Sequence, residues 1–177
     1  FGEVMQRMRR LRAGISHHDS AQRFTDAGVD VFLGQATFTG RNTIEVDGRE
    51  LQFAKAVICT GARAARLPVD GFDDVGYLTN ETLFSLTELP KSLIVIGSGP
   101  IGSEMAQSFR RFGAEVHIID RAERIMPRAE AEAAAIVQAQ CESEGIQLHL
   151  NSNIVRAEKI DGGKRVVVER DGKEHNI

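Results

Sequence analysis

The distribution of apolar and polar positions over the first 28 residues predicts two helices. In the first of them, apolar side chains recur at helical spacing among arginines, at Val4, Met5, Met8 and Leu11. We expect a second helix that is capped by Ser16 or Asp19 and ends at Gly28, because serine and aspartate cap helix N-termini and glycine commonly ends helices. The arginines of the first helix favour a solvated face over an anion site.

From Val29 onward the pattern becomes extended. Strands are predicted where apolar positions alternate or run together between turn residues, at 29–33, near Phe38, at 44–46 and at 51–53. Asp47-Gly48 separates the last two and is a strong hairpin signal. The run 55–59 is predicted to form a buried strand that leads into Thr60 and Gly61, and 67–71 to form an extended connection.

The second half of the chain alternates between helical and extended patterns. Helices are predicted at 79–86, 100–113 and 129–141, and buried strands at 93–96, 115–119 and 147–150. Three last strands, at 154–160, 165–169 and 174–177, are separated by Asp-Gly turns, which predicts an antiparallel meander. The whole pattern predicts an α/β fold with a Rossmann-like βαβ unit followed by that meander.

The strand at 93–96 leads directly into a glycine-rich turn with the spacing GxGxxG. Its residues are Gly97, Ser98, Gly99, Pro100, Ile101 and Gly102. In a dinucleotide site the first glycine makes the turn, the second lets the pyrophosphate approach the backbone, and the third allows close helix packing. The helix that follows offers unpaired N–H groups to the anion. The sequence therefore predicts a dinucleotide site, and a glycine turn that serves packing alone is the alternative.

The second strand of the predicted βαβ unit ends on Asp120, which follows Gly102 by 18 residues. A carboxylate near this position accepts hydrogen bonds from an adenosine ribose, and it repels a 2′-phosphate. Asp120 therefore favours NAD. Arg121 and Arg124 leave NADP open, because a 2′-phosphate needs a nearby guanidinium.

Composition and charge exclude several other classes of function. The chain has 177 residues, a net charge of −3 and an isoelectric point near 6.0, which gives no reason to expect a nucleic-acid partner. No apolar run approaches the roughly 18 residues of a membrane helix. Cys59 and Cys141 form neither a CxxC nor a metal cluster, and the histidines are scattered, so we expect no metal and two thiols packed as small apolar groups in a reducing, cytoplasmic compartment. Because the chain begins with Phe1 inside a helical pattern, we expect a piece of a longer protein.

Several motifs in order resemble the FAD-dependent pyridine nucleotide-disulfide oxidoreductases, nearest to their mercuric reductase and dihydrolipoamide dehydrogenase-like branch. The segments that carry the resemblance are GVDVFLG at 28–34, VICTGA at 57–62, LPVDG at 67–71, LTNETLF at 78–84, GSGPIGSE at 97–104 and RIMPR at 124–128. The similarity covers nearly the whole chain. It implies a partial FAD-binding segment at 1–64 and, at 65–177, an NAD(P)-binding domain that is truncated at its C-terminus.

The resemblance also implies roles for individual residues. Thr60 and Gly61 would approach the FAD by their backbone, and Ala36 is similar to the position that contacts its adenine. Glu104 matches the acidic position that lies toward the nicotinamide ring. As an alternative, Glu104 is an ordinary acid in a first helical turn, where the helix dipole favours it. For the full-length protein the resemblance implies a homodimer.

The chain departs from the family's pattern in what it lacks. It contains no redox cysteine pair, no first FAD glycine loop and no C-terminal dimerisation domain, so we expect no catalytic residue in this chain, no disulfide chemistry and no bound flavin. The leading hypothesis is the nicotinamide-binding part of a flavoprotein that passes hydride from NAD(P)H to FAD and on to a disulfide, metal ion or related acceptor. A nucleotide-binding module without catalysis, and a flavin reductase relative without the cysteine pair, are the alternatives.

Overall fold

The computed structural model describes residues 1–177, and these form two compact units. One unit is Gln6–Arg63, and the other combines Phe1–Met5 with Ala64–Ile177. Helix α1 (Gly2–Ser16) contributes residues to both units. Each unit is described by itself below.

The unit 6–63 contains a small antiparallel sheet. After helix α2 (Ala21–Asp26), the strands β1 (Ala36–Phe38), β2 (Thr43–Val46) and β3 (Arg49–Gln52) pair in that order. Asp47 and Gly48 have φ values of 48° and 80° in the turn between β2 and β3, which confirms the predicted hairpin. Val46 is the only buried residue of this unit.

The predicted cap of the second helix is wrong. Helix α1 runs on to Ser16, whose hydroxyl donates to the Ala13 carbonyl inside that helix, and Asp19 lies in the following turn. The N-cap of α2 is Ser20, whose side chain accepts a hydrogen bond from the Arg23 N–H at 3.2 Å. Because α1 extends through Ser16 and α2 begins only at Ala21, the residue directly before the first turn of α2 is Ser20, and it takes the cap position.

Two predicted strands of this unit do not form. Residues 29–33 and 55–59 have no regular structure, and no other segment of the chain pairs with them. Val57 is 87% exposed and Ile58 is 70% exposed. Cys59, which was expected to be packed, is exposed for the same reason. Without a neighbouring strand the backbone groups of an apolar run gain nothing from an extended, paired conformation.

The larger unit is built on a parallel sheet. Strands β4 (Ser92–Ile96), β5 (Glu115–Ile119) and β6 (Gln147–His149) lie in that order, and the helices α4 (Pro100–Phe112) and α5 (Ala131–Ser143) connect them. All five elements lie within one or two residues of their predicted bounds. Together with the meander described next, they confirm the predicted α/β fold class and its βαβ unit.

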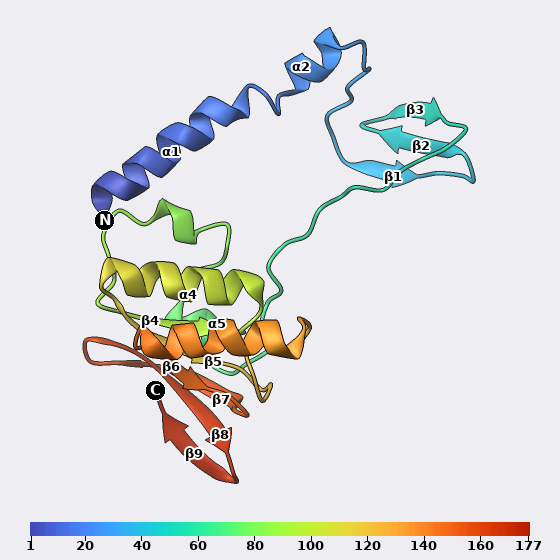
Figure 1. Ribbon diagram of the computed structural model, residues 1–177. Helices are drawn as coiled ribbons and strands as arrows, with labels where there is room; N and C mark the ends of the chain where they lie inside the picture. Colours follow the sequence, from blue (N-terminus) through green and yellow to red (C-terminus); the bar gives the residue numbers. More distant parts are fainter. The chain divides into compact units, whose positions relative to one another are not determined.

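Both faces of the parallel sheet are covered, as Figure 1 shows for this unit. Alternate side chains, among them Val116 and Ile118, pack with α4 and α5 in the main core. On the opposite face, Ile119 and Ile94 pack against the meander of β7 (Asn153–Ile160), β8 (Gly163–Arg170) and β9 (Lys173–Asn176). This two-sided burial explains why β4 carries a continuous apolar run, at 93–96, rather than an alternating pattern.

Two short helical segments complete the secondary structure of the larger unit. Helix α3 (Phe72–Val75) packs on the meander through Phe72 and Val75, and the helix predicted at 79–86 is only the 3₁₀ turn η1 (Leu83–Ser85). The Thr82 hydroxyl accepts the N–H of Thr79 at 2.8 Å, and such local bonds compete with a regular helix. None of the helices has the length and apolar content needed to cross a membrane.

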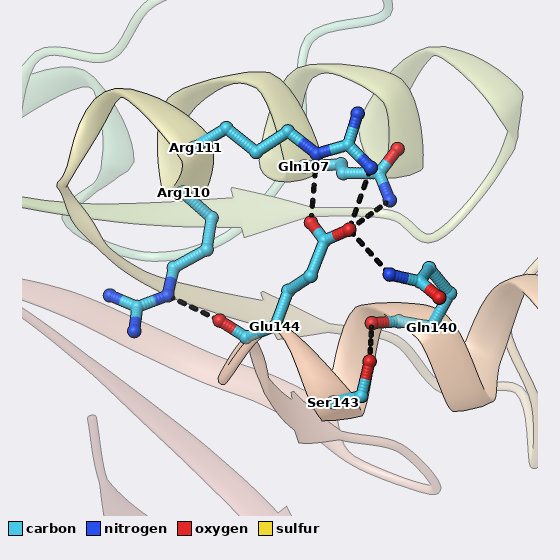
Figure 2. Close-up of polar contacts among 6 residues, drawn as sticks. All are labelled: Gln107, Arg110, Arg111, Gln140, Ser143 and Glu144. Atoms are coloured by element: carbon cyan, nitrogen blue, oxygen red, sulfur yellow. Dashed lines mark hydrogen bonds and ion pairs between the residues drawn. The ribbon is translucent and has the colours of Figure 1, made fainter.

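A polar network fastens the C-terminal end of α5 to α4, as Figure 2 shows. Glu144 accepts hydrogen bonds from both Nε and Nη2 of Arg111, at 3.0 and 2.6 Å, and from Gln107 and Gln140. The Arg110 guanidinium donates to the Glu144 backbone carbonyl at 2.7 Å. These bonds lower the pKa of Glu144 to about 2, chiefly through Arg111. The network fixes the distance between the two helices that cover the parallel sheet.

Candidate functional site

The turn between β4 and α4 uses its three glycines in different ways. Gly97 has a φ of 94°, in the left-handed region, and its N–H bonds to the Ile119 carbonyl at 2.9 Å. A Cβ on Gly102 would collide with the Gly97 carbonyl oxygen, so this helix position must be glycine for α4 to pack on β4. A Cβ on Gly99 would meet nothing within 4 Å. The turn is therefore tight on its inner side and open at Gly99.

The open side of the turn is also the N-terminus of α4. Pro100 occupies the first helical position. The first hydrogen bond of the helix runs from the Ser103 N–H to the Gly99 carbonyl, at 2.9 Å. The N–H groups of Ile101 and Gly102 precede that bond and have no intrahelical acceptor. Together with the helix dipole they make this end suited to an anion. Ile101 is 62% exposed, so the turn is accessible from solvent.

Ser98 is buried and its polar groups are all used inside the protein. Its N–H and its hydroxyl both donate to Oδ2 of Asp120 at 2.6 Å. Its carbonyl accepts the Met126 N–H at 2.7 Å and the Ser103 hydroxyl at 3.1 Å. Ser98 was predicted to contact the coenzyme, but the structure gives its donors to Asp120.

Asp120 points back to the glycine turn. Besides the two bonds from Ser98, its Oδ1 accepts the Ala122 N–H at 2.9 Å. Partial burial raises the pKa of this carboxyl, but the hydrogen bonds from Ser98 and Ala122 outweigh that effect, with help from the charge of Arg121, and the net pKa is lowered. Asp120 is thus held as a carboxylate beside the turn.

The two arginines after Asp120 differ in their availability. The Arg124 guanidinium donates to the carbonyls of Met126, Pro127 and Ala129 at 3.0 to 3.1 Å. Arg121 is exposed, and its charge contributes to the lowered pKa of Asp120. Of the two, Arg121 is the one that remains available to a ligand.

The other residues predicted for the site are exposed. Glu104 lies one helical turn into α4, on the surface. Ala36 is the first residue of β1, and Thr60 and Gly61 lie in the irregular segment after residue 59, all three in the unit 6–63. Their roles stay predictions.

The structure adds a segment that sequence reasoning did not connect to the turn. Residues 122–129 fold back so that Met126, with a φ of 45°, donates to the Ser98 carbonyl, and the bonds from Arg124 hold this bend. The sequence RIMPR at 124–128 was the available signal, but only as part of a family resemblance. Through the bond from Met126, the segment 122–129 supports the backbone of the glycine turn.

Two histidines that were expected to be scattered lie together. His117 on β5 and His149 on β6 bring Nδ1 and Nε2 within 3.1 Å. Burial lowers the pKa of His149, and His117, Arg170 and His175 lower it further. No group of three or more potential metal ligands occurs in the structure.

Comparisons with known proteins give a consistent result. The family model described as pyridine nucleotide-disulphide oxidoreductase matches residues 6–177. The chain is 35% identical over 152 residues to the mercuric reductase of Bacillus cereus, and the match covers 86% of this chain and 24% of that protein. It is 32% identical over 135 residues to a dihydrolipoyl dehydrogenase of Bacillus subtilis (strain 168), and this match covers 74% of this chain and 30% of that protein. The chain thus spans about a quarter to a third of these relatives.

Solved structures agree with this result. The HOCl-induced flavoprotein disulfide reductase RclA from Escherichia coli superposes with a TM-score of 0.80 at 27% identity, over 99% of this chain and 40% of that one. A ferredoxin reductase for the CYP199A2 system from Rhodopseudomonas palustris superposes with a TM-score of 0.72 at 26% identity, over 88% of this chain and 41% of that one.

Proposed function

This chain belongs to the pyridine nucleotide-disulphide oxidoreductase family, as its motifs predicted, and from that premise we propose that residues 65–177 bind the pyrophosphate of a nicotinamide dinucleotide at the turn 97–102. The observation that carries the proposal is the asymmetry of the turn. Gly102 is closed by the Gly97 carbonyl, whereas Gly99 faces open space at a helix N-terminus. A glycine turn that served packing alone would need the first feature and not the second.

Each part of the site has a separate task in this proposal. The backbone N–H groups at the start of α4 would hold the pyrophosphate, and Asp120 would accept hydrogen bonds from the adenosine ribose. Glu104 would lie toward the nicotinamide end, where it helps to place the ring. The coenzyme supplies the hydride when it is bound, and the protein contributes position and electrostatics.

The coenzyme that these residues suit better is NADH. Asp120 is held as a carboxylate, which favours free ribose hydroxyls over a 2′-phosphate. Arg124 is committed to three backbone carbonyls, so Arg121 alone remains for a 2′-phosphate. The proposal is that the domain binds NADH more tightly than NADPH.

In the full-length protein, this domain would deliver hydride to FAD and from there to a disulfide, metal ion or related acceptor. Support comes from the relatives, which are named as mercuric reductases, dihydrolipoyl dehydrogenases and a flavoprotein disulfide reductase. Ala36, Thr60 and Gly61 are the residues of this chain that would approach the flavin nucleotide.

A second candidate is a flavin reductase without a redox cysteine pair, and the similarity to the ferredoxin reductase favours it. The two candidates separate on the gene sequence upstream of Phe1. A CxxxxC motif there supports the disulfide or metal reductase, and an upstream FAD glycine loop without any cysteine pair supports the second candidate.

The dinucleotide site itself is tested by titrating the chain with NADH and following the coenzyme fluorescence. Gly99→Val should abolish binding, because the side chain fills the space that the pyrophosphate needs. Gly163→Val is the matched control, since Gly163 also has open space for a Cβ and an ordinary φ, but lies in the meander. Equal binding by both variants would contradict the site.

A further inference from the structure

Ser98 lies in the glycine turn, yet both of its hydrogen-bond donors are already used inside the protein. Its side chain is fully buried, and its N–H and hydroxyl both reach the same carboxylate oxygen, Oδ2 of Asp120. Two donors from one residue on one oxygen fix the orientation of a carboxylate more closely than one donor does. Ser98 is therefore placed to act through Asp120.

The carbonyl side of Ser98 is equally constrained. Met126 and Ser103 donate to it at 2.7 and 3.1 Å, from the bend 122–129 and from α4. Ser98 thus cannot turn to release Asp120 unless the bend or the helix shifts. The hydroxyl, unlike the backbone, can be removed by substitution while these two bonds stay.

The bonding leaves acceptor capacity on Asp120 in one place. A carboxylate has about four acceptor positions on its two oxygens. Oδ2 receives both donors of Ser98, and Oδ1 receives only the Ala122 N–H at 2.9 Å. Oδ1 is therefore the oxygen that can accept further hydrogen bonds. The Ser98 hydroxyl makes the two oxygens differ, because it adds a second donor to Oδ2.

We propose that Ser98 is a positioning residue whose hydroxyl holds the Asp120 carboxylate in the orientation that selects a coenzyme with a free ribose 2′-hydroxyl over one with a 2′-phosphate. This inference rests on the proposed dinucleotide site and deepens it. The hydroxyl bond also stabilises the charged form of Asp120, in keeping with its lowered pKa. A fixed negative charge accepts ribose hydroxyls and repels a phosphate.

The test measures the dissociation constants of NADH and NADPH for the 177-residue chain and its variants by coenzyme fluorescence. Ser98→Ala should lower the ratio of NADPH to NADH dissociation constants by about tenfold, near the lower end of the effect of one hydrogen bond to a charged group. Ser152→Ala is the matched control, because it also removes a buried serine hydroxyl, here bonded to the Leu150 carbonyl, but leaves every bond of Ser98 in place. Its ratio should stay at the wild-type value.

Asp120→Asn provides a second, independent arm, because an amide oxygen can still accept from Ser98 while the charge is gone. Asp120→Asn should reduce the ratio of NADPH to NADH dissociation constants at least as far as Ser98→Ala does. The double variant that carries both substitutions should have the same ratio as Asp120→Asn alone. This arm keeps the test decisive if Ser98→Ala does not fold, which circular dichroism would show.

The outcomes separate the two proposals. If wild-type chain binds neither coenzyme, the dinucleotide site is wrong and the role of Ser98 falls with it. If wild-type chain prefers NADH but Ser98→Ala weakens both coenzymes equally, the site stands and Ser98 is only structural. An unchanged ratio in Asp120→Asn would likewise overturn the selection role.

Discussion

Two apolar runs of this chain each lead into a glycine turn, and only one of them becomes a strand. Residues 93–96 form most of β4, which pairs with β5 and is covered on both faces. Residues 56–59 have the same kind of pattern and precede Gly61, but they lie exposed without a pairing partner. The difference lies in the neighbours that the chain supplies and not in the runs themselves.

The comparison extends to the turns that follow the runs. After β4, the helix packs so closely that a Cβ on Gly102 would strike the Gly97 carbonyl, whereas a Cβ on Gly61 would meet nothing. The turn at 97–102 is thus shaped by packing from several sides. A ligand site needs such support, because a loop with no contacts has no fixed geometry to offer.

The largest effect that tests this comparison is a deletion of core volume. Ile118 is fully buried between β5 and the helices, and Ile58 is 70% exposed. Ile118→Ala should lower the free energy of unfolding by about 2–5 kcal/mol, through lost burial and the cavity that remains. Ile58→Ala should change it by less than about 0.5 kcal/mol. Urea denaturation of both variants measures the difference, and a comparable loss in Ile58→Ala would show that the run 56–59 is packed in solution.

The second effect concerns the turn itself. Gly102→Ala should lower the free energy of unfolding by about 1–3 kcal/mol, because the new methyl group forces α4 away from β4. Gly99→Ala has open space and an ordinary φ of −66°, so it should leave stability nearly unchanged while it weakens NADH binding. Thermal unfolding and a coenzyme titration on the same two proteins would check this. If Gly99→Ala were the less stable variant, the turn would not be open where the structure places it.

These pairs also show how much of the molecule could be predicted from its sequence. The βαβ unit and the meander are encoded locally, by period, by Pro100, and by glycines such as Gly113 at the end of α4, whose φ is 106°. The strand at 55–59 was mispredicted because pairing is not a local property. The bonds from Ser98 to Asp120 cross 22 positions, so no spacing rule could assign them. The sequence located the glycine turn of the candidate site, and long-range contacts decide how its residues are held.

A smaller effect depends on pH and compares the paired histidines of the parallel sheet with an exposed one. The pKa of His149 is lowered in the folded protein, first by burial and then by His117 and nearby cations. The unfolded chain therefore binds more protons below its ordinary pKa of 6.5, and folding stability should fall as pH drops from about 7 to 5. His149→Gln should flatten that part of the stability curve, whereas His17→Gln, on the exposed segment before α2, should leave it as in wild type. Denaturant midpoints at several pH values would show it, and an equal slope in all three proteins would contradict the pairing.

The smallest effect tests the network that fastens α5 to α4. A glutamate at a helix C-terminus is unfavourable by itself, but Arg111 and Gln140 stabilise its charged form and lower the pKa of Glu144 to about 2. The folded carboxylate therefore contributes stability that is present above pH 4.5 and is lost as pH falls from 4.5 toward 2. Glu144→Gln should remove part of the wild-type stability at pH 7 and nearly none at pH 2, and Glu50→Gln on the exposed strand β3 should change neither. Acid unfolding followed by circular dichroism distinguishes these curves. A deficit in Glu144→Gln that persisted at pH 2 would mean that the side chain acts through shape and not through charge, and the two covering helices would then depend on packing alone.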